Sequence, residues 1–243
     1  MISILLYSKK NIFSFLFLLV AIVAHAQTKI IASLENKLAV AKTSAEKQAV
    51  VFLLCEQGSN MHPDTLLSYA KMAKLVALNE HNLHDEVRSM YYECMAYTTK
   101  GLIDSSLKIA AECSAILSGK VDDADLLANI YNQMGRCFMR KNQYKEAIEM
   151  GYKTIIGAEK TGNTLLEIKG KTLIGWAHLE VGQYNDALSW HLKALHTTTD
   201  SLLLEKYGIL FANLALNYIN IGKKEKLLLQ AALNQVFFSL KQA

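Results

Sequence analysis

The chain has 243 residues, of which 51% are hydrophobic and one is proline, and its formal net charge is +4. So small a charge, to which Lys9 and Lys10 contribute two units, gives no case for nucleic-acid binding. The single proline and the lack of a glycine- and serine-rich linker favour one continuous helical body over separate domains on a flexible connection.

The first 26 residues have the pattern of a secretory signal peptide. Lys9 and Lys10 precede an apolar run from Ile12 to Val23, and the run ends in Ala24-His25-Ala26, a small-x-small pattern. The run is shorter than the roughly 20 apolar residues that a membrane-spanning helix needs. We therefore expect cleavage after Ala26 and an extracytoplasmic chain, periplasmic or secreted, that begins near Gln27. A retained N-terminal anchor is the alternative.

Two helices are expected next, from Ile30 to Ala41 and from Gln48 to Gln57, ahead of the repeated part of the chain. The four cysteines of the chain are spaced in no zinc-binding pattern, and we expect them to be small buried apolar residues. These are Cys55, Cys94, Cys113 and Cys137. A disulfide between Cys94 and Cys113 is the alternative, because the repeat alignment below places both on the inner faces of one helical pair.

A repeat with a period of 40 residues predicts stacked structural units. The segment KNQYKEAIEMGYKTI, from Lys141 to Ile155, returns as VGQYNDALSWHLKAL, from Val181 to Leu195. Upstream the register shifts by one, so that Cys94 precedes Gly135 by 41 residues. The chain after residue 26 is thereby divided into approximate units at 46–82, 84–120, 124–162, 164–200 and 202–240.

Each unit has the pattern of two helices joined by a polar turn. In the unit at 124–162, apolar residues recur at helical spacing between Leu127 and Phe138, and the polar turn lies at Lys141 to Gln143. The inner face of the second helix is expected to carry Tyr144, Ala147, Ile148, Tyr152 and Ile155. Small residues such as Gly135 are expected to let the two helices approach closely. One pair cannot bury both of its apolar faces, so pairs must stack.

These residues resemble the pattern of the tetratricopeptide repeat (TPR) family, which places a small residue and a ring residue in the first helix, a Gly or Asn turn, and then an aromatic, an alanine and an apolar residue. The pattern is found here as Gly175, His178, Gly182, Tyr184, Ala187, Ala194 and Leu195. The resemblance implies an all-α, TPR-like α-solenoid of about five antiparallel helical pairs in a right-handed superhelix. It also implies that Tyr184 is a core residue. The period exceeds the family's usual length of about 34, so each pair should be about six residues longer.

A narrower resemblance comes from the order of secretion signal, N-terminal helices and repeats, which is similar to the extracytoplasmic TPR regions of bacterial sensor histidine kinases and related regulators. On this resemblance the chain is either a free-standing secreted repeat protein or the truncated sensory input region of such a protein. An apolar C-terminal helix favours truncation or association with a partner. Its apolar residues are Leu227, Leu228, Leu229, Val236, Phe237 and Phe238.

Signals for catalysis are weak, because the sequence has no phosphate-binding loop, nucleophile elbow or carboxylate pair with a supporting base. His81 and His84, with two acidic residues after them, are in principle a divalent-metal site, but a solvated connection between units is the preferred interpretation. His178 and His191 occupy ring positions of the TPR pattern, so we expect them to pack. We therefore expect no metal, no cofactor and no enzyme. An enzyme with an unrecognised site is the alternative.

The expected function is a non-catalytic protein–protein interaction module that binds a peptide or a partner domain in its concave groove. In a stacked array the first helix of each pair lines this groove. The residues on its outward stripe are Arg88, Tyr92, Asn129, Asn132, Arg136, Arg140, Thr172, Trp176 and Leu179. Tyrosine, tryptophan and arginine dominate binding energies at interfaces. The alternative is that Trp176 packs between first helices and that the arginines are ordinary solvated charges.

Overall fold

The computed structural model describes residues 29–58, 61–119, 121–200 and 209–221. These residues are helical apart from short connections, and no β-strand occurs among them. The expected signal peptide at 1–26 and the apolar residues at 227–238 lie outside the described residues. Within the described part of the chain, no helix combines the length and the hydropathy that a membrane span requires.

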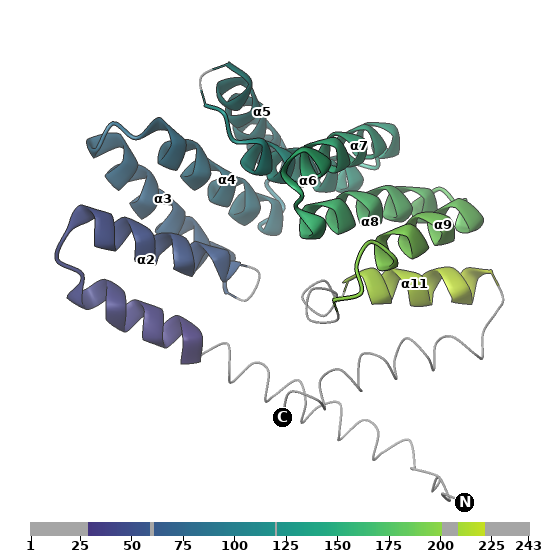
Figure 1. The fold of residues 1–243 in the computed structure, drawn as a ribbon, viewed down its shortest axis with the longest axis horizontal. Coiled ribbons are helices and arrows are strands. Elements are labelled where there is room, and N and C mark those ends of the chain that lie inside the picture. Colours follow the sequence, from purple (N-terminus) through teal and green to yellow (C-terminus); the bar gives the residue numbers. More distant parts are fainter. Residues whose placement is uncertain (1–28, 59–60, 120, 201–208, 222–243) are drawn as a thin grey trace, which may run out of the picture.

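A helix at 29–40 is followed by the labelled helices of Figure 1. Their bounds are α2 Ser44–Glu56, α3 Pro63–Asn79, α4 Leu83–Thr99, α5 Ile103–Gly119, α6 Ala124–Arg140, α7 Tyr144–Thr161, α8 Thr164–Glu180, α9 Tyr184–Leu195 and α11 Ile209–Asn220. Helix α2 begins four residues before the predicted Gln48 because Thr43 and Glu46 form a capping box, in which each side chain bonds the other's backbone amide.

The helices form a solenoid in which each helix packs on the next along the chain. First helices of neighbouring pairs also touch, because α4 contacts α6, α6 contacts α8 and α8 contacts α11. Figure 1 shows the resulting arc, with the helix at 29–40 and then α2 at one end and α11 at the other. The predicted all-α solenoid of stacked helical pairs is therefore confirmed. Helices α6 and α7 have 17 and 18 residues and so fill most of one 40-residue period.

The ends of the helices are set by left-handed residues that recur at the repeat spacing. Gly101, Asn142 and Gly182 have φ angles of 80°, 58° and 77°. After each of them, the next amide donates a 2.9 Å hydrogen bond to the carbonyl five residues earlier. This arrangement satisfies carbonyls that the end of a helix leaves without partners. The polar turn predicted at 141–143 is thus confirmed as the end of α6.

Small residues allow the close approach that the repeat predicts. A β-carbon at Gly135 would overlap the side chain of Leu173 on α8 and would lie 3.1 Å from Cβ of Met150 on α7. Gly135 therefore sits where three helices converge. The roughly 1 kcal/mol that glycine costs inside a helix is offset by this close contact.

Two tyrosines that were predicted on inner faces are exposed. Tyr152 is 46% exposed, and its ring meets Trp190 of α9 edge-on at 5.6 Å. Tyr184 is 37% exposed, whereas Tyr144, one repeat earlier, packs against a cluster that contains Leu173. The residue 40 positions after Leu173 is Asn213, so the apolar wall that receives Tyr144 has no equivalent for Tyr184. The prediction that Tyr184 is a core residue was wrong.

All four cysteines are free and buried, as small apolar residues. Cys94 does not form the alternative disulfide with Cys113; its thiol donates to the carbonyl of Ser106 at 3.5 Å. Contact with Cys113, together with burial, raises the pKa of the Cys94 thiol. The thiol is therefore protonated at ordinary pH.

Candidate binding groove

A groove with a volume of about 790 Å³ lies on the inner side of the arc, and alternate helices line it. All of its lining residues come from α2, α4, α6, α8 and α11. These helices contact one another along the inner side of the solenoid, while α3, α5, α7 and α9 lie behind them. The groove is therefore a product of the repeat itself, because each first helix presents the same stripe to the same side.

The structure brings seven of the nine predicted residues into this groove. They are Tyr92, Asn129, Asn132, Arg136, Arg140, Thr172 and Trp176. Arg88 lies beside it, where its guanidinium pairs with Glu56 at 2.9 Å and covers the ring of Phe52 at 4.1 Å. Leu179 is half-buried on α8 and is not part of the lining.

Several lining residues were missed by the sequence analysis, among them Tyr91, Gln133, Lys169 and Asn213. The repeat contained a signal for two of them. Lys169 stands 40 residues after Asn129, a predicted groove residue, and the two side chains meet at 3.5 Å. Tyr91 stands 41 residues before Asn132, which is the register of the upstream repeats. Both residues follow from the predicted groove residues when the offsets of 40 and 41 residues are applied to each of them.

Three cations of the groove have no carboxylate partner among the described residues. The side chains of Arg136 and Arg140 make no ion pair or hydrogen bond with a described residue. The side chain of Lys169 bonds only the amide oxygen of Asn129. Glu56 is the one acidic residue among the described lining residues, and it is paired with Arg88. Burial and the neighbouring Arg136 lower the pKa of Lys169. The described lining therefore has three cations without a carboxylate partner and one acidic residue that is already paired.

Amide side chains that are largely buried also line the groove. Asn132 is 8% exposed and Asn213 is 5% exposed. The Nδ2 of Asn213 is buried and has no hydrogen-bond partner among the described residues, and the side chain of Asn132 makes no hydrogen bond with any of them. Gln133 differs, because its Nε2 donates to Thr98 Oγ1 at 2.5 Å. An unpaired amide costs free energy when buried and offers both a donor and an acceptor to a ligand.

Aromatic side chains form the apolar part of the lining. The rings of Tyr91 and Tyr92 lie 5.2 Å apart on α4, and burial raises the pKa of Tyr92 to about 12. On α8, Trp176 donates its indole N–H to Glu180 at 2.8 Å and is half-exposed. At ordinary pH the tyrosine hydroxyls are neutral. Rings with a polar edge suit contact with a partner side chain.

A buried histidine supports the α8 wall from behind. His191 is fully buried, with Nε2 lying 3.3 Å from the carbonyl oxygen of Thr172 and Nδ1 lying 2.5 Å from Nδ2 of Asn217. A neutral ring satisfies both contacts when Nε2 donates and Nδ1 accepts. Burial lowers its pKa to about 4. The prediction that His191 packs is confirmed, whereas His178 is half-exposed and bonds Gln183.

The histidines considered as metal ligands have other roles in the described chain. His81 lies in the turn between α3 and α4, and His84 lies 2.8 Å from Asp123, the N-cap of α6. Among the residues that the structure describes, no three His, Cys, Asp or Glu side chains converge on one point as metal ligands would. Burial raises the pKa of Cys55, the thiol in the groove, to about 12, so it is no activated nucleophile.

Comparisons with known proteins place the fold. No protein-family model and no curated protein sequence matches the chain. Among solved structures, BtubC (BKLC) from P. vanneervenii has a TM-score of 0.58 at 12% identity and covers 90% of this chain and 88% of its own. A putative kinesin light chain from Podosopora anserina, with nearly identical TPR-like repeats, has a TM-score of 0.56 at 16% identity and covers 81% and 95%. The chain has a TPR-like fold.

A Rap protein in complex with competence and sporulation factor is also similar, with a TM-score of 0.63 at 14% identity, covering 90% of this chain and 70% of its own. Identities this low carry the fold and leave function to be argued from the groove. The narrower resemblance to sensor histidine kinases stays a prediction. In this TPR-like stack the groove offers cations, amides and rings, which is the chemistry of a binding surface.

Proposed function

We propose that the chain is a non-catalytic protein–protein interaction module that binds an extended segment of a partner protein along the concave groove. The observation that carries the proposal is a groove built by five alternate helices and lined by cations, rings and amides, one of which, Asn213, has a buried Nδ2 with no described partner. An extended segment brings a backbone N–H and C=O at every residue. Asn132 and Asn213 are amides whose donors and acceptors match them.

A solved neighbour supports the proposal. The Rap protein, which has a similar fold, is complexed with competence and sporulation factor, so a protein of this shape holds a second molecule. The alternating helices of the present chain offer a groove about 790 Å³ in volume, which is of the size that takes several side chains of a bound segment.

Photo-cross-linking tests where the partner binds. A photoreactive phenylalanine derivative placed at Trp176 reports from the groove, and the same group at Leu75 reports from α3, where the side chain is 61% exposed and outside the lining. We expect a cross-linked partner from position 176 alone, with the adduct mapping to one short segment. Equal cross-linking from position 75 would contradict binding of the partner in the groove.

Substitution in the groove provides the second test. Arg136→Ala combined with Trp176→Ala is expected to abolish capture of the cross-linked partner and to leave the far-UV helicity unchanged, because neither side chain is fully buried. The matched control is Lys108→Ala with Lys160→Ala, two exposed residues on α5 and α7. Undiminished capture by the groove variant would contradict the proposal.

An extracytoplasmic location is part of the proposal and rests on the sequence. Lys9, Lys10, the apolar run and Ala24-His25-Ala26 together favour export and cleavage. Mass spectrometry of the protein from its native source is expected to find Gln27 at the N-terminus; an intact Met1 would contradict it. The sensory-input alternative instead predicts in-frame codons for a membrane helix and a kinase module after Ala243.

Association through the apolar segment at 227–238 is a second proposed contact, and it also rests on the sequence alone. Seven of the twelve residues of this segment are large and apolar, which favours contact with another apolar surface. Light scattering tests it: Phe237→Ser with Phe238→Ser should lower the measured mass if this segment joins two copies. An unchanged mass would remove self-association from the proposal.

A further inference from the structure

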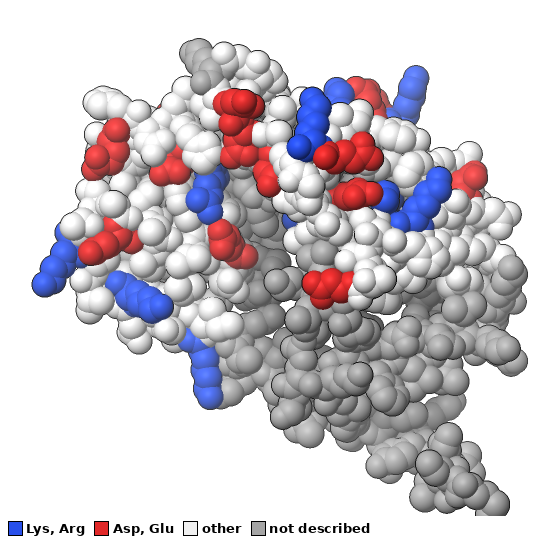
Figure 2. Space-filling model, in the orientation of Figure 1, with Lys and Arg blue, Asp and Glu red and all other residues white. Residues whose placement is uncertain are grey.

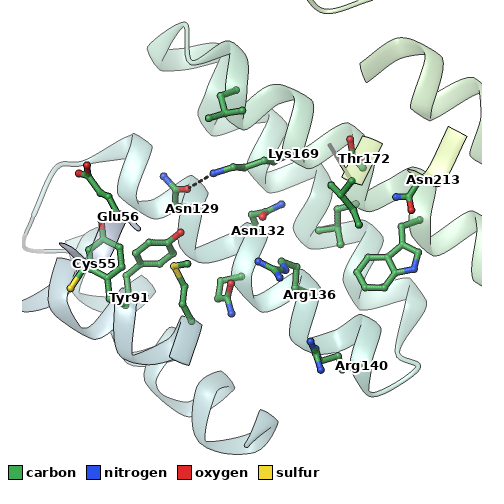
Figure 3. Close-up of a pocket in the computed structure, with 17 residues that line it drawn as sticks. Cys55, Glu56, Tyr91, Asn129, Asn132, Arg136, Arg140, Lys169, Thr172 and Asn213 are labelled. Atoms are coloured by element: carbon green, nitrogen blue, oxygen red, sulfur yellow. Dashed lines mark hydrogen bonds between the residues drawn. The ribbon is translucent and has the colours of Figure 1, made fainter. Parts of the chain in front are cut away.

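We infer that the segment bound in the groove is acidic, and that its carboxylates pair with Arg136, Arg140 and Lys169. The inference deepens the proposed function and rests on it. It starts from the position of three cations in one groove, whose described lining has a single acidic residue, Glu56, that is already paired with Arg88. Figure 3 shows Lys169 and Arg136 reaching into the groove from α8 and α6, with Arg140 further along α6.

Outside these three, 15 Lys and Arg residues are described, and five of them pair with carboxylates. Lys100 pairs with Asp64 at 2.5 Å, and Lys141 pairs with Asp104 at 2.7 Å. Figure 2 shows lysine and arginine interspersed with acidic residues over the face in view. The three groove cations have no such partner among the described residues, although two of them lie close enough to repel each other. Repulsion between Arg136 and Lys169 is one cause of the lowered pKa of Lys169.

The spacing of the cations suits a chain with more than one carboxylate. Arg136 and Arg140 are one turn apart on α6, which separates their positions by about 6 Å along the helix. Lys169 faces them from α8 and is held against Asn129. A carboxylate between Arg136 and Lys169 would remove their mutual repulsion, and Arg140 would meet a second one. Guanidinium groups bind carboxylates through two parallel hydrogen bonds, which fixes the bound group as well as attracting it.

A second, independent observation indicates that a peptide carries these carboxylates. Asn213 is 5% exposed, lines the same groove from α11, and has an Nδ2 with no described partner. A free anion at Arg136 would leave this buried donor unsatisfied, whereas a peptide backbone that continues toward α11 supplies a carbonyl to it. The rings of Tyr92 and Trp176 also line the groove, so the segment would have apolar contact between its charges.

Fluorescence anisotropy with two labelled decapeptides tests the inference on the purified protein. The probes are an alternating glutamate and alanine sequence and its counterpart with glutamine in place of glutamate. We expect the glutamate probe to bind at least about tenfold more tightly, a difference of about 1.4 kcal/mol. Its binding should weaken as the salt concentration is raised from about 20 to about 300 mM, because salt screens partly exposed charges.

Two double variants locate the effect. Arg136→Gln with Arg140→Gln is expected to weaken the glutamate probe about tenfold and to leave the glutamine probe unchanged. Lys108→Gln with Lys160→Gln removes the same charge from exposed positions outside the groove and is expected to change the affinity by less than about twofold. Circular dichroism of the original protein and of both double variants checks that the fold is retained.

Three results would overturn the inference: equal binding of the two probes, an equal loss in the two double variants, or no measurable binding of the glutamate probe. Displacement of that probe by inorganic phosphate at an equal concentration would also overturn it, since an anion site would then suffice. The proposed function has a separate test. If the segment cross-linked from position 176 is neutral, groove binding stands and the acidic partner does not.

Discussion

The imidazole of His191 on α9 lies directly against the backbone of Gly175 on α8. A β-carbon at position 175 would stand 2.5 Å from Nε2 and 2.6 Å from Cδ2 of the ring, closer than real β-carbons approach other atoms. The ring is held by Thr172 and Asn217, so it has no free direction in which to move. Gly175 is therefore what lets α8 and α9 close around a buried histidine.

Gly175→Ala is expected to lower the free energy of unfolding by about 1 to 3 kcal/mol, because overlap in a filled core outweighs the roughly 1 kcal/mol that alanine adds to helix propensity. Urea denaturation measures the change. Gly119→Ala is the matched control, since Gly119 is helical and a β-carbon there would meet no atom within 4 Å. An alanine at 175 that is tolerated as well as the one at 119 would contradict the contact.

The stability of the protein is expected to fall with pH below neutrality because of His191. Burial lowers its pKa in the folded state to about 4, below the 6.5 that is usual for histidine. As the pH drops below about 6.5, His191 becomes protonated in the unfolded chain but stays neutral in the folded chain. The free energy of unfolding therefore decreases, and it levels off below about pH 4. The loss from this residue amounts to about 3 kcal/mol.

His191→Phe removes the titrating group, so the difference in stability between the variant and the original protein should shrink steadily from pH 7 to about pH 4. His196→Gln, a substitution of an exposed histidine at the end of the same helix, should keep the original pH dependence. Denaturation midpoints across the range provide the measurement. A constant difference between His191→Phe and the original protein would mean that the ring is not held neutral.

Tyr144 and Tyr184 occupy the same position of successive repeats, but they should contribute unequally to the stability of the protein. Tyr144 packs against the Leu173 cluster and donates its hydroxyl to Asn142 at 3.0 Å, while Tyr184 is 37% exposed. Tyr184→Ala is expected to lower the free energy of unfolding by about 1 kcal/mol, well below the 3 to 5 kcal/mol that removal of a fully buried ring costs. Tyr144→Ala is expected to lower it by about 1 to 2 kcal/mol more than Tyr184→Ala does. Equal costs in thermal or urea denaturation would contradict the burial of the two rings.

The architecture could be predicted from the sequence because the residues that make a given helix contact recur in each repeat. In the sequence, Gly135 and its counterpart Gly175 indicate helix contacts, and Asn142 and Gly182 indicate helix ends, and the structure has both features at these positions. The buried face of a helix was harder to predict. A single stripe was assumed for α6, but this helix packs on α4, α5, α7 and α8, so burial extends around most of its circumference. Ala128 and Met139, which were outside the stripe, are buried as a result.

The groove was predicted in outline and missed in detail for a related reason. Which first-helix residues face inward follows from the period, so Asn132, Arg136 and Trp176 were found. How far each one reaches depends on the neighbouring helices, which the sequence does not give. Thr172 was predicted to face a ligand, but its side chain is 2% exposed and bonds the carbonyl of Ile168. The exposure of Tyr184 likewise depends on a polar residue in the next unit.

A histidine at a left-handed position provides a test of the helix ends. His81 has a φ of 51° in the turn between α3 and α4, where the amide of Asn82 closes the helix by bonding the carbonyl of Ala77 at 2.9 Å. A side chain in this conformation costs about 1 to 2 kcal/mol, which glycine avoids. His81→Gly is therefore expected to raise the free energy of unfolding by about 1 kcal/mol, after the added freedom of the unfolded chain is subtracted.

Gly101→Ala is the reciprocal change at the equivalent turn between α4 and α5. Its φ is 80°, and a β-carbon there would meet no atom within 4 Å, so the whole cost is conformational. We expect a loss of about 1 to 2 kcal/mol. Urea denaturation of both variants should therefore move in opposite directions. If His81→Gly destabilises the protein, the imidazole has a stabilising contact that outweighs the strain of its backbone.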